Sequence, residues 1–191
     1  MSELNKKNNF DNLRLNEQLT LVLEKAETSK DTHKAFVKKI SNGRLVESNN
    51  SNSHVIVCFI PYDVKKNMIL LVHNIATDLW LTPAAHVHDG ENLIDTVKRE
   101  AYEELGLRLD HVELPFLLTL TKAKSKKRPH CKQHFDVWFI IRVKPKEISI
   151  NKEEKEASDY CWEKLDSNFK DVSDPATIIA IEALKKRYLS S

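Results

Sequence analysis

The stretch from Asn92 to Gly106 reads NLIDTVKREAYEELG and carries the signals that begin and end a helix. Asn92 is a favourable N-cap, Asp95 stands three positions later near the positive end of the helix dipole, and Gly106 suits a C-terminal stop. Between them, four apolar residues recur with helical spacing and form one stripe: Ile94, Val97, Ala101 and Leu105. The pattern predicts a helix from Asn92 to Leu105.

Three glutamates gather on the neighbouring face of this helix: Glu100, Glu103 and Glu104. A solvated acidic face is the ordinary explanation for such residues and is an open alternative. Two effects oppose it, because Glu100 and Glu104 repel each other at i and i+4, and the helix dipole disfavours carboxylates in the last turns by about 0.3 to 1 kcal/mol each. A hard divalent cation reverses the sign of both effects, so this face is a candidate site for Mg²⁺ or Mn²⁺.

The surrounding residues 84–107, AAHVHDGENLIDTVKREAYEELGL, resemble the Nudix box. That motif has the form G-x5-E-x7-R-E-U-x-E-E-x-G-U, with U aliphatic, and this chain departs from it only at the first glycine, which is Ala85. The resemblance covers residues 54–165 and implies an α/β fold, the Nudix α/β/α sandwich with a mixed β-sheet. It also implies a hydrolase that uses Mg²⁺, or else Mn²⁺, to cleave the pyrophosphate bond of a nucleoside diphosphate linked to another moiety.

The resemblance assigns a role to each residue of the box. The expected metal ligands are Glu100, Glu103, Glu104 and the main-chain carbonyl of Ala84. Arg99 is expected to orient the glutamates through charge-assisted hydrogen bonds, and Glu91 to support the loop before the helix. Glu103, Glu104 or a group from a later loop is expected to take the proton of the attacking water.

Ala84 and Ala85 stand where the family usually has two glycines. If position 85 requires a positive φ, alanine is strained there by an amount on the order of 1 kcal/mol, and the carbonyl of Ala84 is displaced. If that position has a negative φ, nothing is lost. The alternative function is therefore a catalytically impaired Nudix-fold module that binds a nucleotide or acts in regulation.

Three further polar residues are candidates for contacts with the substrate: His86, His134 and Asp136. His134 and Asp136 belong to the segment HFDVWF, which is similar to a segment that passes close to the substrate in a subset of Nudix hydrolases. Ordinary polar residues at the end of a strand are the alternative. His86 and His88 also share one face of a predicted strand, which makes a zinc pair conceivable. No other ligands converge in the sequence, so we expect hydrogen-bonded histidines beside the site instead.

The rest of the chain divides into three parts. Residues 1–46 are predicted to form a helical extension that packs on the core or makes a homodimer contact, and residues 47–54 a polar linker. Residues 55–191 are predicted to form the Nudix domain, in which short apolar runs bounded by turn residues are typical of strands. Its final helix is expected to have Asp174 as the N-cap and Pro175 at the first helical position.

The chain has 191 residues, a net charge of +2, and three cysteines without a C-x-x-C spacing. The small net charge argues against a nucleic-acid partner. A basic loop at residues 122–132 is suited to steer a polyphosphate or an RNA backbone, and the alternative is an ordinary solvated run of charges. The odd number of cysteines favours a reducing compartment, and no apolar run is long enough to span a bilayer. We therefore expect a cytoplasmic protein that acts on a small nucleotide or related diphosphate and has no membrane partner.

Overall fold

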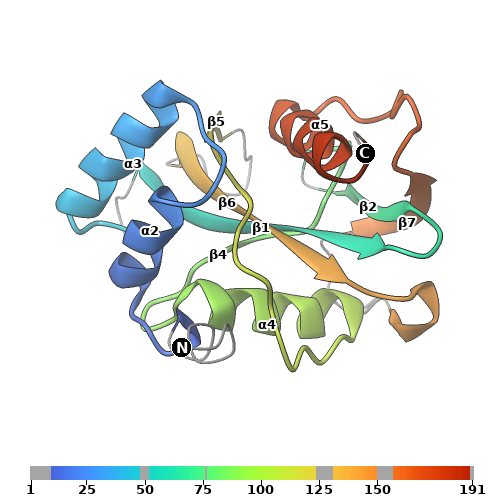
Figure 1. The fold of residues 1–191 in the computed structure, drawn as a ribbon, viewed down its shortest axis with the longest axis horizontal. Helices are drawn as coiled ribbons and strands as arrows, with labels where there is room; N and C mark the ends of the chain where they lie inside the picture. Colours follow the sequence, from blue (N-terminus) through green and yellow to red (C-terminus); the bar gives the residue numbers. More distant parts are fainter. Residues whose placement is uncertain (1–9, 48–51, 76, 124–130, 150–156, 190–191) are drawn as a thin grey trace.

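The computed structural model describes residues 10–47, 52–75, 77–123, 131–149 and 157–189. Its helices and strands follow in chain order (Figure 1): α2 (Leu15–Leu23), α3 (Lys30–Ser41), β1 (Ser53–Asp63), β2 (Met68–Asn74), β3 (Leu79–Leu81), β4 (Ala84–His86), α4 (Leu93–Leu105), β5 (Leu117–Lys122), β6 (Gln133–Arg142), the short 3₁₀ helix η1 (Pro145–Glu147), β7 (Ala157–Lys164) and α5 (Pro175–Leu189).

One mixed sheet contains all of these strands. Its main order is β3-β2-β1-β6-β5, with β7 paired to β2. Strands β1 and β6 are parallel along ten residue pairs, whereas β5 pairs with β6 in the antiparallel sense. Strand β1 divides its other edge between two antiparallel partners, because Ile56–Cys58 pair with β4 and Tyr62–Asp63 pair with β2. The sheet is therefore mixed, as the sequence predicted.

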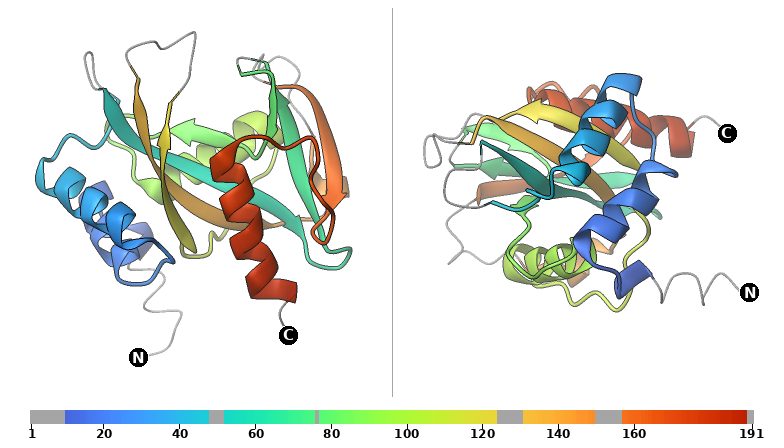
Figure 2. Two further views of the ribbon diagram at one scale, coloured as in Figure 1. Left: turned by 90° about the horizontal axis from the view of Figure 1, so that it is seen from above. Right: turned by 90° about the vertical axis from the view of Figure 1, so that its left-hand side faces the viewer.

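Alternate residues of the central strands build two separate cores. On one face, Val55, Val57 and Phe59 of β1 pack in the same cluster as the buried stripe of α4. On the other face, Ile56 and Ile60 pack in a cluster that includes the buried residues of α5. The views in Figures 1 and 2 show α4 and α5 on opposite sides of the sheet. This arrangement confirms the α/β/α sandwich, and it explains why β6 is apolar along nearly its whole length.

Helix α4 begins and ends as its sequence predicts. The side chain of Asn92 accepts hydrogen bonds from the amides of Ile94 (2.9 Å) and Asp95 (3.0 Å), and Asp95 accepts one back from the Asn92 amide. Gly106 follows the helix with φ 66°, in the left-handed region. A Cβ atom at this position would lie 3.0 Å from the carbonyl oxygen of Ser149, so both the backbone conformation and the tight space favour glycine.

The N-terminal helices share the core of the α4 face. Leu19 and Val22 of α2 and Phe36 of α3 are buried in the same cluster as Val55 and Phe59 of β1. Strand β1 starts at Ser53, so the last two residues of the predicted linker 47–54 belong to the sheet, and residues 48–51 lie outside the described residues.

Gln18 of α2 connects this extension to the box helix. Its side chain is fully buried; the Nε2 group donates to the carbonyl of Phe10 (2.8 Å), and Oε1 accepts from the Leu93 amide (2.8 Å). Leu93 is the first residue of α4, so one of the free amides at the start of that helix is satisfied by the extension. The N-terminal helices therefore help to position the helix that carries the glutamates.

The end of the chain also agrees with its predicted caps. Helix α5 starts at Pro175, and the carboxylate of Asp174 accepts a hydrogen bond from the Thr177 amide (2.8 Å). Among the described residues, no helix combines the length and the apolar character needed to cross a membrane.

Candidate functional site

Arg99 is the centre of a network of ion pairs on α4. Its guanidinium donates to both oxygens of Glu91, at 2.6 and 3.1 Å, and to Glu103 at 3.0 Å. It also contacts the carboxylate of Glu100 and donates to the main-chain carbonyl of His86 at 3.1 Å. The Arg99 side chain is only 20% exposed. One side chain thus joins the loop before the helix, strand β4 and two carboxylates of the helix, and we call Arg99 with Glu91, Glu100, Glu103 and Glu104 the glutamate site.

Glu91 anchors the loop that leads into α4. Besides Arg99, its carboxylate accepts hydrogen bonds from the His88 amide (3.1 Å) and the Thr96 hydroxyl (3.0 Å). Burial opposes its ionisation, but the hydrogen bonds from Arg99, His88 and Thr96 outweigh burial and lower the pKa of Glu91 to about 2. Glu91 is therefore ionised throughout the neutral range and holds the guanidinium in one orientation.

The glutamate site has an excess of negative charge. Burial alone would lower the pKa of Arg99, but its bonds to Glu91, Glu100 and Glu103 raise that pKa above its usual value. Among the described residues, the guanidinium of Arg99 contacts three glutamates, Glu91, Glu100 and Glu103, and no basic residue lies in the last turn of α4. Glu100 is 15% exposed and Glu103 40% exposed, so their oxygens lie at the border between protein and solvent. Carboxylate oxygens of this kind suit a hard divalent cation.

Ala84 and Ala85 have ordinary strand geometry. They pair with Cys58 and Val57 of β1 as part of β4. Among the described residues, the non-glycine residues with positive φ are Asn67, Asp78 and Phe169, so neither alanine adopts the left-handed conformation. Ala85 is also well buried, at 5% exposed. Alanine is therefore not strained at position 85, and glycine is not required there by the backbone.

Asp136 is buried on the α5 face of the sheet. Its carboxylate accepts hydrogen bonds from the hydroxyls of Thr119 (2.6 Å) and Thr121 (3.0 Å) on β5, and Thr119 in turn accepts one from the indole of Trp138 (2.8 Å). Burial raises the pKa of Asp136 to about 7, against the opposing effect of the two threonines. Such a carboxyl group exchanges its proton near neutral pH, which is a property of many functional sites.

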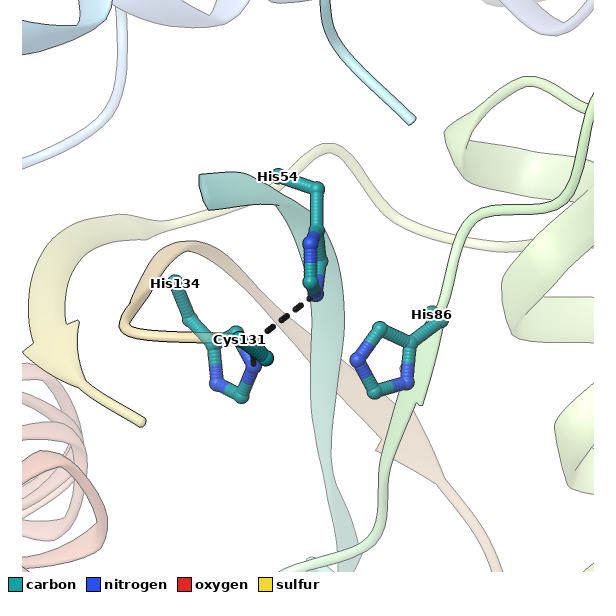
Figure 3. Close-up of side chains that lie close together, drawn as sticks. All are labelled: His54, His86, Cys131 and His134. Carbon is teal, nitrogen blue, oxygen red and sulfur yellow. Dashed lines mark hydrogen bonds between the residues drawn. The ribbon is translucent and has the colours of Figure 1, made fainter. Parts of the chain in front are cut away.

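His86 and His134, predicted as substrate contacts, lie together with two residues that the sequence did not single out (Figure 3). The ring centroid of His54 lies 4.6 Å from that of His86 and 5.1 Å from that of His134. The sulfur of Cys131 lies 3.4 Å from Nε2 of His54 and 2.9 Å from Nε2 of His134. We call these four residues the His/Cys cluster.

The zinc pair that we considered for His86 and His88 does not form. Strand β4 ends at His86, and His88 lies in the exposed loop beyond it, with Nδ1 3.7 Å from Glu91. His54 was missed because the sequence placed it in a polar linker, and Cys131 because it lies within the predicted basic loop at residues 122–132. Most of that predicted loop, residues 124–130 with His130, lies outside the described residues.

Comparison with known proteins gives the family. The model of the NUDIX domain matches residues 52–181. An RNA pyrophosphohydrolase from Ruthia magnifica subsp. Calyptogena magnifica is 30% identical over 108 residues, which cover 51% of this chain and 60% of that protein. A second, from Shewanella frigidimarina, is 26% identical over 109 residues, covering 53% and 60%. This chain thus spans about 60% of the length of these curated relatives.

Solved structures share the fold at low sequence identity. The E. coli dihydroneopterin triphosphate pyrophosphohydrolase superposes with a TM-score of 0.59 at 14% identity, covering 72% of this chain and 96% of that one. The NUDIX domain of Shewanella oneidensis NrtR, solved with ADP ribose, gives 0.55 at 16% identity, covering 73% and 90%. The box around Arg99, the mixed sheet between α4 and α5 and the match over residues 52–181 lead to one conclusion: this chain belongs to the NUDIX domain family.

Proposed function

We propose that this protein is a hydrolase that cleaves the pyrophosphate bond of a nucleoside diphosphate linked to another moiety, with Mg²⁺ as the metal and Mn²⁺ as a substitute. The observation that carries the proposal is the network of Arg99, which holds Glu91, Glu100 and Glu103 around one guanidinium beside β4. A helix selected only for stability would not collect carboxylates at the negative end of its dipole.

The donor groups fit a hard divalent cation. The proposed ligands are Glu100, Glu103, Glu104 and the main-chain carbonyl of Ala84, all of which offer oxygen atoms. When bound, such an ion neutralises charge on the pyrophosphate and makes a bound water more acidic. Beyond the ion, hydrolysis requires that the chain orient the metal ligands and supply a base for the attacking water. We assign both roles to residues of the glutamate site.

Each residue of the glutamate site then has its own proposed role in the reaction. Arg99 fixes the carboxylates of Glu100 and Glu103, and Glu91 fixes Arg99, so the ligand oxygens are oriented before substrate arrives. Glu103 or Glu104 takes the proton of the water that attacks phosphorus. The bond from that phosphorus to the bridging oxygen breaks, and the bridging oxygen leaves on the second phosphate.

The alternative of an impaired binding module depended on strain at Ala85. The normal geometry of β4 removes the reason for that strain, because the backbone of Ala84 and Ala85 avoids positive φ. We therefore favour the hydrolase. The alternative predicts binding of a nucleotide, seen by calorimetry, in a protein that releases no product.

The proposal for the substrate is a small nucleotide or related diphosphate. Three residues on the α5 face of the sheet are proposed to line the substrate site: His86, His134 and Asp136. The curated relatives are named for RNA, so an RNA with a 5′-triphosphate belongs in the test, although the net charge of +2 supplies no general attraction for nucleic acid. A cytoplasmic location is part of the same proposal and is supported by three cysteines that form no disulfide.

We propose that residues 55–191 carry the activity and that residues 1–46 act as an extension that braces α4, as the bond from Leu93 to Gln18 suggests. The second proposed role of these helices is a homodimer contact.

A panel of substrates tests the proposed function. It contains nucleoside triphosphates, nucleotide sugars, dinucleoside polyphosphates, ADP-ribose and 5′-triphosphorylated RNA, each with Mg²⁺, with Mn²⁺ and with chelator. We expect turnover of at least one compound, dependent on the metal, and a loss of about 10²-fold or more in Glu104→Gln. The matched control is Glu182→Gln, an exposed glutamate of α5, which should retain activity. Full activity in Glu104→Gln would refute the assigned roles.

A further inference from the structure

We propose that the His/Cys cluster binds one Zn²⁺ ion, in a site separate from the glutamate site. Within the described residues, His54, His86, Cys131 and His134 form the group of His, Cys, Asp and Glu side chains whose ligand atoms all lie within 4.8 Å of one another. Each of the four offers one nitrogen or sulfur atom, and Figure 3 shows the three imidazole rings gathered around the cysteine.

The pairing of the strands brings the three histidines together. His54 of β1 lies directly opposite His134 of the parallel strand β6, and Ile56 of β1 lies opposite His86 of β4. Side chains of paired residues point to the same face of a sheet, and residues two apart on one strand share that face. The register of β1 with its two neighbours therefore places all three imidazoles on the α5 face.

The segment just before β6 brings the thiol to the same place. The amides of Lys132 (2.9 Å) and Gln133 (3.1 Å) donate to the carbonyl of Asn52, next to the start of β1, and the Ala123 amide donates to the carbonyl of Lys132 (3.0 Å). These bonds fix the backbone just after Cys131 against the residue before β1. The side chain of Cys131 is consequently buried, at 3% exposed, with its sulfur against His54 and His134.

The distances suit a tetrahedral ion. With a Zn–S bond of about 2.3 Å and Zn–N bonds of about 2.0 to 2.1 Å, a tetrahedral site separates sulfur from nitrogen by about 3.6 Å and two nitrogens by about 3.3 Å. The two S–N distances given for Cys131 are 2.9 and 3.4 Å, and every pair of ligand atoms lies within 4.8 Å. The tetrahedral separations fall within the range that these distances span.

The kind of donor selects the metal. Three imidazoles and one thiolate suit zinc, whereas Mg²⁺ and Mn²⁺ prefer the oxygen donors of the glutamate site. Four protein ligands also fill the tetrahedral shell and leave no position for water, which is typical of a structural zinc site rather than a catalytic one. His54 is fully buried, so such an ion would be closed off from solvent on at least that side.

The proposed ion would hold three separate parts of the chain together. It would link the start of β1, the end of β4 and the segment before β6. It would also be connected to the glutamate site, because the main-chain carbonyl of His86 accepts a hydrogen bond from Arg99. His86 and His134 would then serve as metal ligands, and Asp136 would remain the candidate for direct contact with substrate.

Metal analysis of the full chain tests this proposal without any assay of hydrolysis. The protein is purified, stripped with a chelator, titrated with Zn²⁺ against a chromophoric indicator, and analysed by inductively coupled plasma mass spectrometry. We expect about one tightly bound zinc per chain. Loss of a residue that only hydrogen-bonds a metal ligand lowers metal affinity by about 10 to 100-fold, so Cys131→Ser, which removes a ligand itself, should lower zinc affinity by at least about 100-fold. Two matched controls should still bind one zinc: Cys161→Ser, which removes a cysteine of β7 outside the cluster, and Glu104→Gln in the box.

Cobalt substitution keeps the test decisive if Cys131→Ser fails to fold. Co²⁺ in the unaltered protein should give the intense visible bands of a tetrahedral complex and a near-ultraviolet band from thiolate to Co²⁺, and both should disappear when Zn²⁺ is added. Absence of stoichiometric zinc and of these bands would overturn the proposal, as would zinc binding that survives in a folded Cys131→Ser. Copper or iron bound in place of zinc would overturn the assignment of the metal.

Discussion

The glutamate site and the His/Cys cluster differ in nearly every physical property, although one residue, His86, contacts both. The first collects oxygen atoms, carries an excess of negative charge and has side chains up to 40% exposed. The second collects nitrogen and sulfur atoms, and both His54 and Cys131 are buried. Hard cations favour the first and borderline ones the second. On our two proposals, one domain separates two metals by the chemistry of the donors alone.

His86 is where the two regions meet. Its carbonyl accepts a hydrogen bond from Arg99 at 3.1 Å, whereas its imidazole belongs to the His/Cys cluster. Displacing the imidazole would therefore shift a main-chain partner of Arg99. Changes confined to one region are the means to learn whether the regions act independently, and the following predictions run from the largest expected effect to the smallest.

Removal of zinc should have the largest effect on stability. A ligand present at about 1,000 times its dissociation constant stabilises the folded state by about 4 kcal/mol, which corresponds to about 8 to 16 °C in Tm for a chain of this size. Stripped protein should lose this amount in thermal scans followed by circular dichroism. Zn²⁺ should restore the Tm and Mg²⁺ should not; equal restoration by both ions would contradict the separation of the two sites.

Arg99→Lys should have the next largest effect, and on activity. Lysine keeps the charge but loses the planar fork that holds both oxygens of Glu91 together with Glu100 and Glu103. Misplaced ligand oxygens should lower kcat by about 100-fold, or about 2.7 kcal/mol in the barrier. The measurement is steady-state turnover of whichever compound of the panel is hydrolysed.

A second arginine provides the control for that prediction. Arg142 of β6 also pairs with a glutamate, Glu113, at 2.7 Å, but its side chain is 54% exposed and lies outside the box. Arg142→Lys should therefore change turnover little. If both variants lost activity equally, the effect of Arg99→Lys would reflect general damage instead of a role in the glutamate site. Zinc content should remain at one per chain in both variants.

The two regions also differ in how far the sequence predicted them. The ends of α4 could be predicted because caps such as Asn92 and Gly106 act within a few residues of themselves. The partners of Arg99 followed from a motif whose members lie within one loop and one helix. Local signals of this kind also predicted the strands and the final helix. The mixed sheet was predicted from the family resemblance.

The His/Cys cluster could not be predicted, because its histidines meet through the register of three strands and Cys131 joins them from the segment before β6. Nothing near His54 in the sequence indicates that it will face His134 across the β1–β6 pair, eighty positions later along the chain. The polar stretch before it favoured a linker, so its place at the start of β1 was also missed. The backbone of Ala85 was equally undetermined, since a family pattern of glycines does not reveal which φ this chain adopts.

The pairing of Glu91 should appear in the pH dependence of stability. Its pKa falls from 4.5 to about 2 on folding, so its stabilising effect is fully present above about pH 4.5 and is lost as the pH decreases toward 2. Glu91→Gln should cost on the order of 2 kcal/mol near neutral pH, after allowance for partial exposure, and progressively less below pH 4.5. Urea unfolding at several pH values measures this; a difference that stayed constant down to pH 2 would contradict it.

The smallest effect is expected from Ala85→Gly, which returns the box to the usual pattern of the family. Position 85 has ordinary strand geometry and pairs with Val57, so glycine relieves no strain there. Glycine within a strand instead costs about 0.5 to 1 kcal/mol in conformational entropy, or about 1 to 4 °C in Tm. Turnover should be unchanged, alone or combined with Ala84→Gly. A rise in turnover of about tenfold or more would mean that the alanines impair the glutamate site, contrary to this prediction.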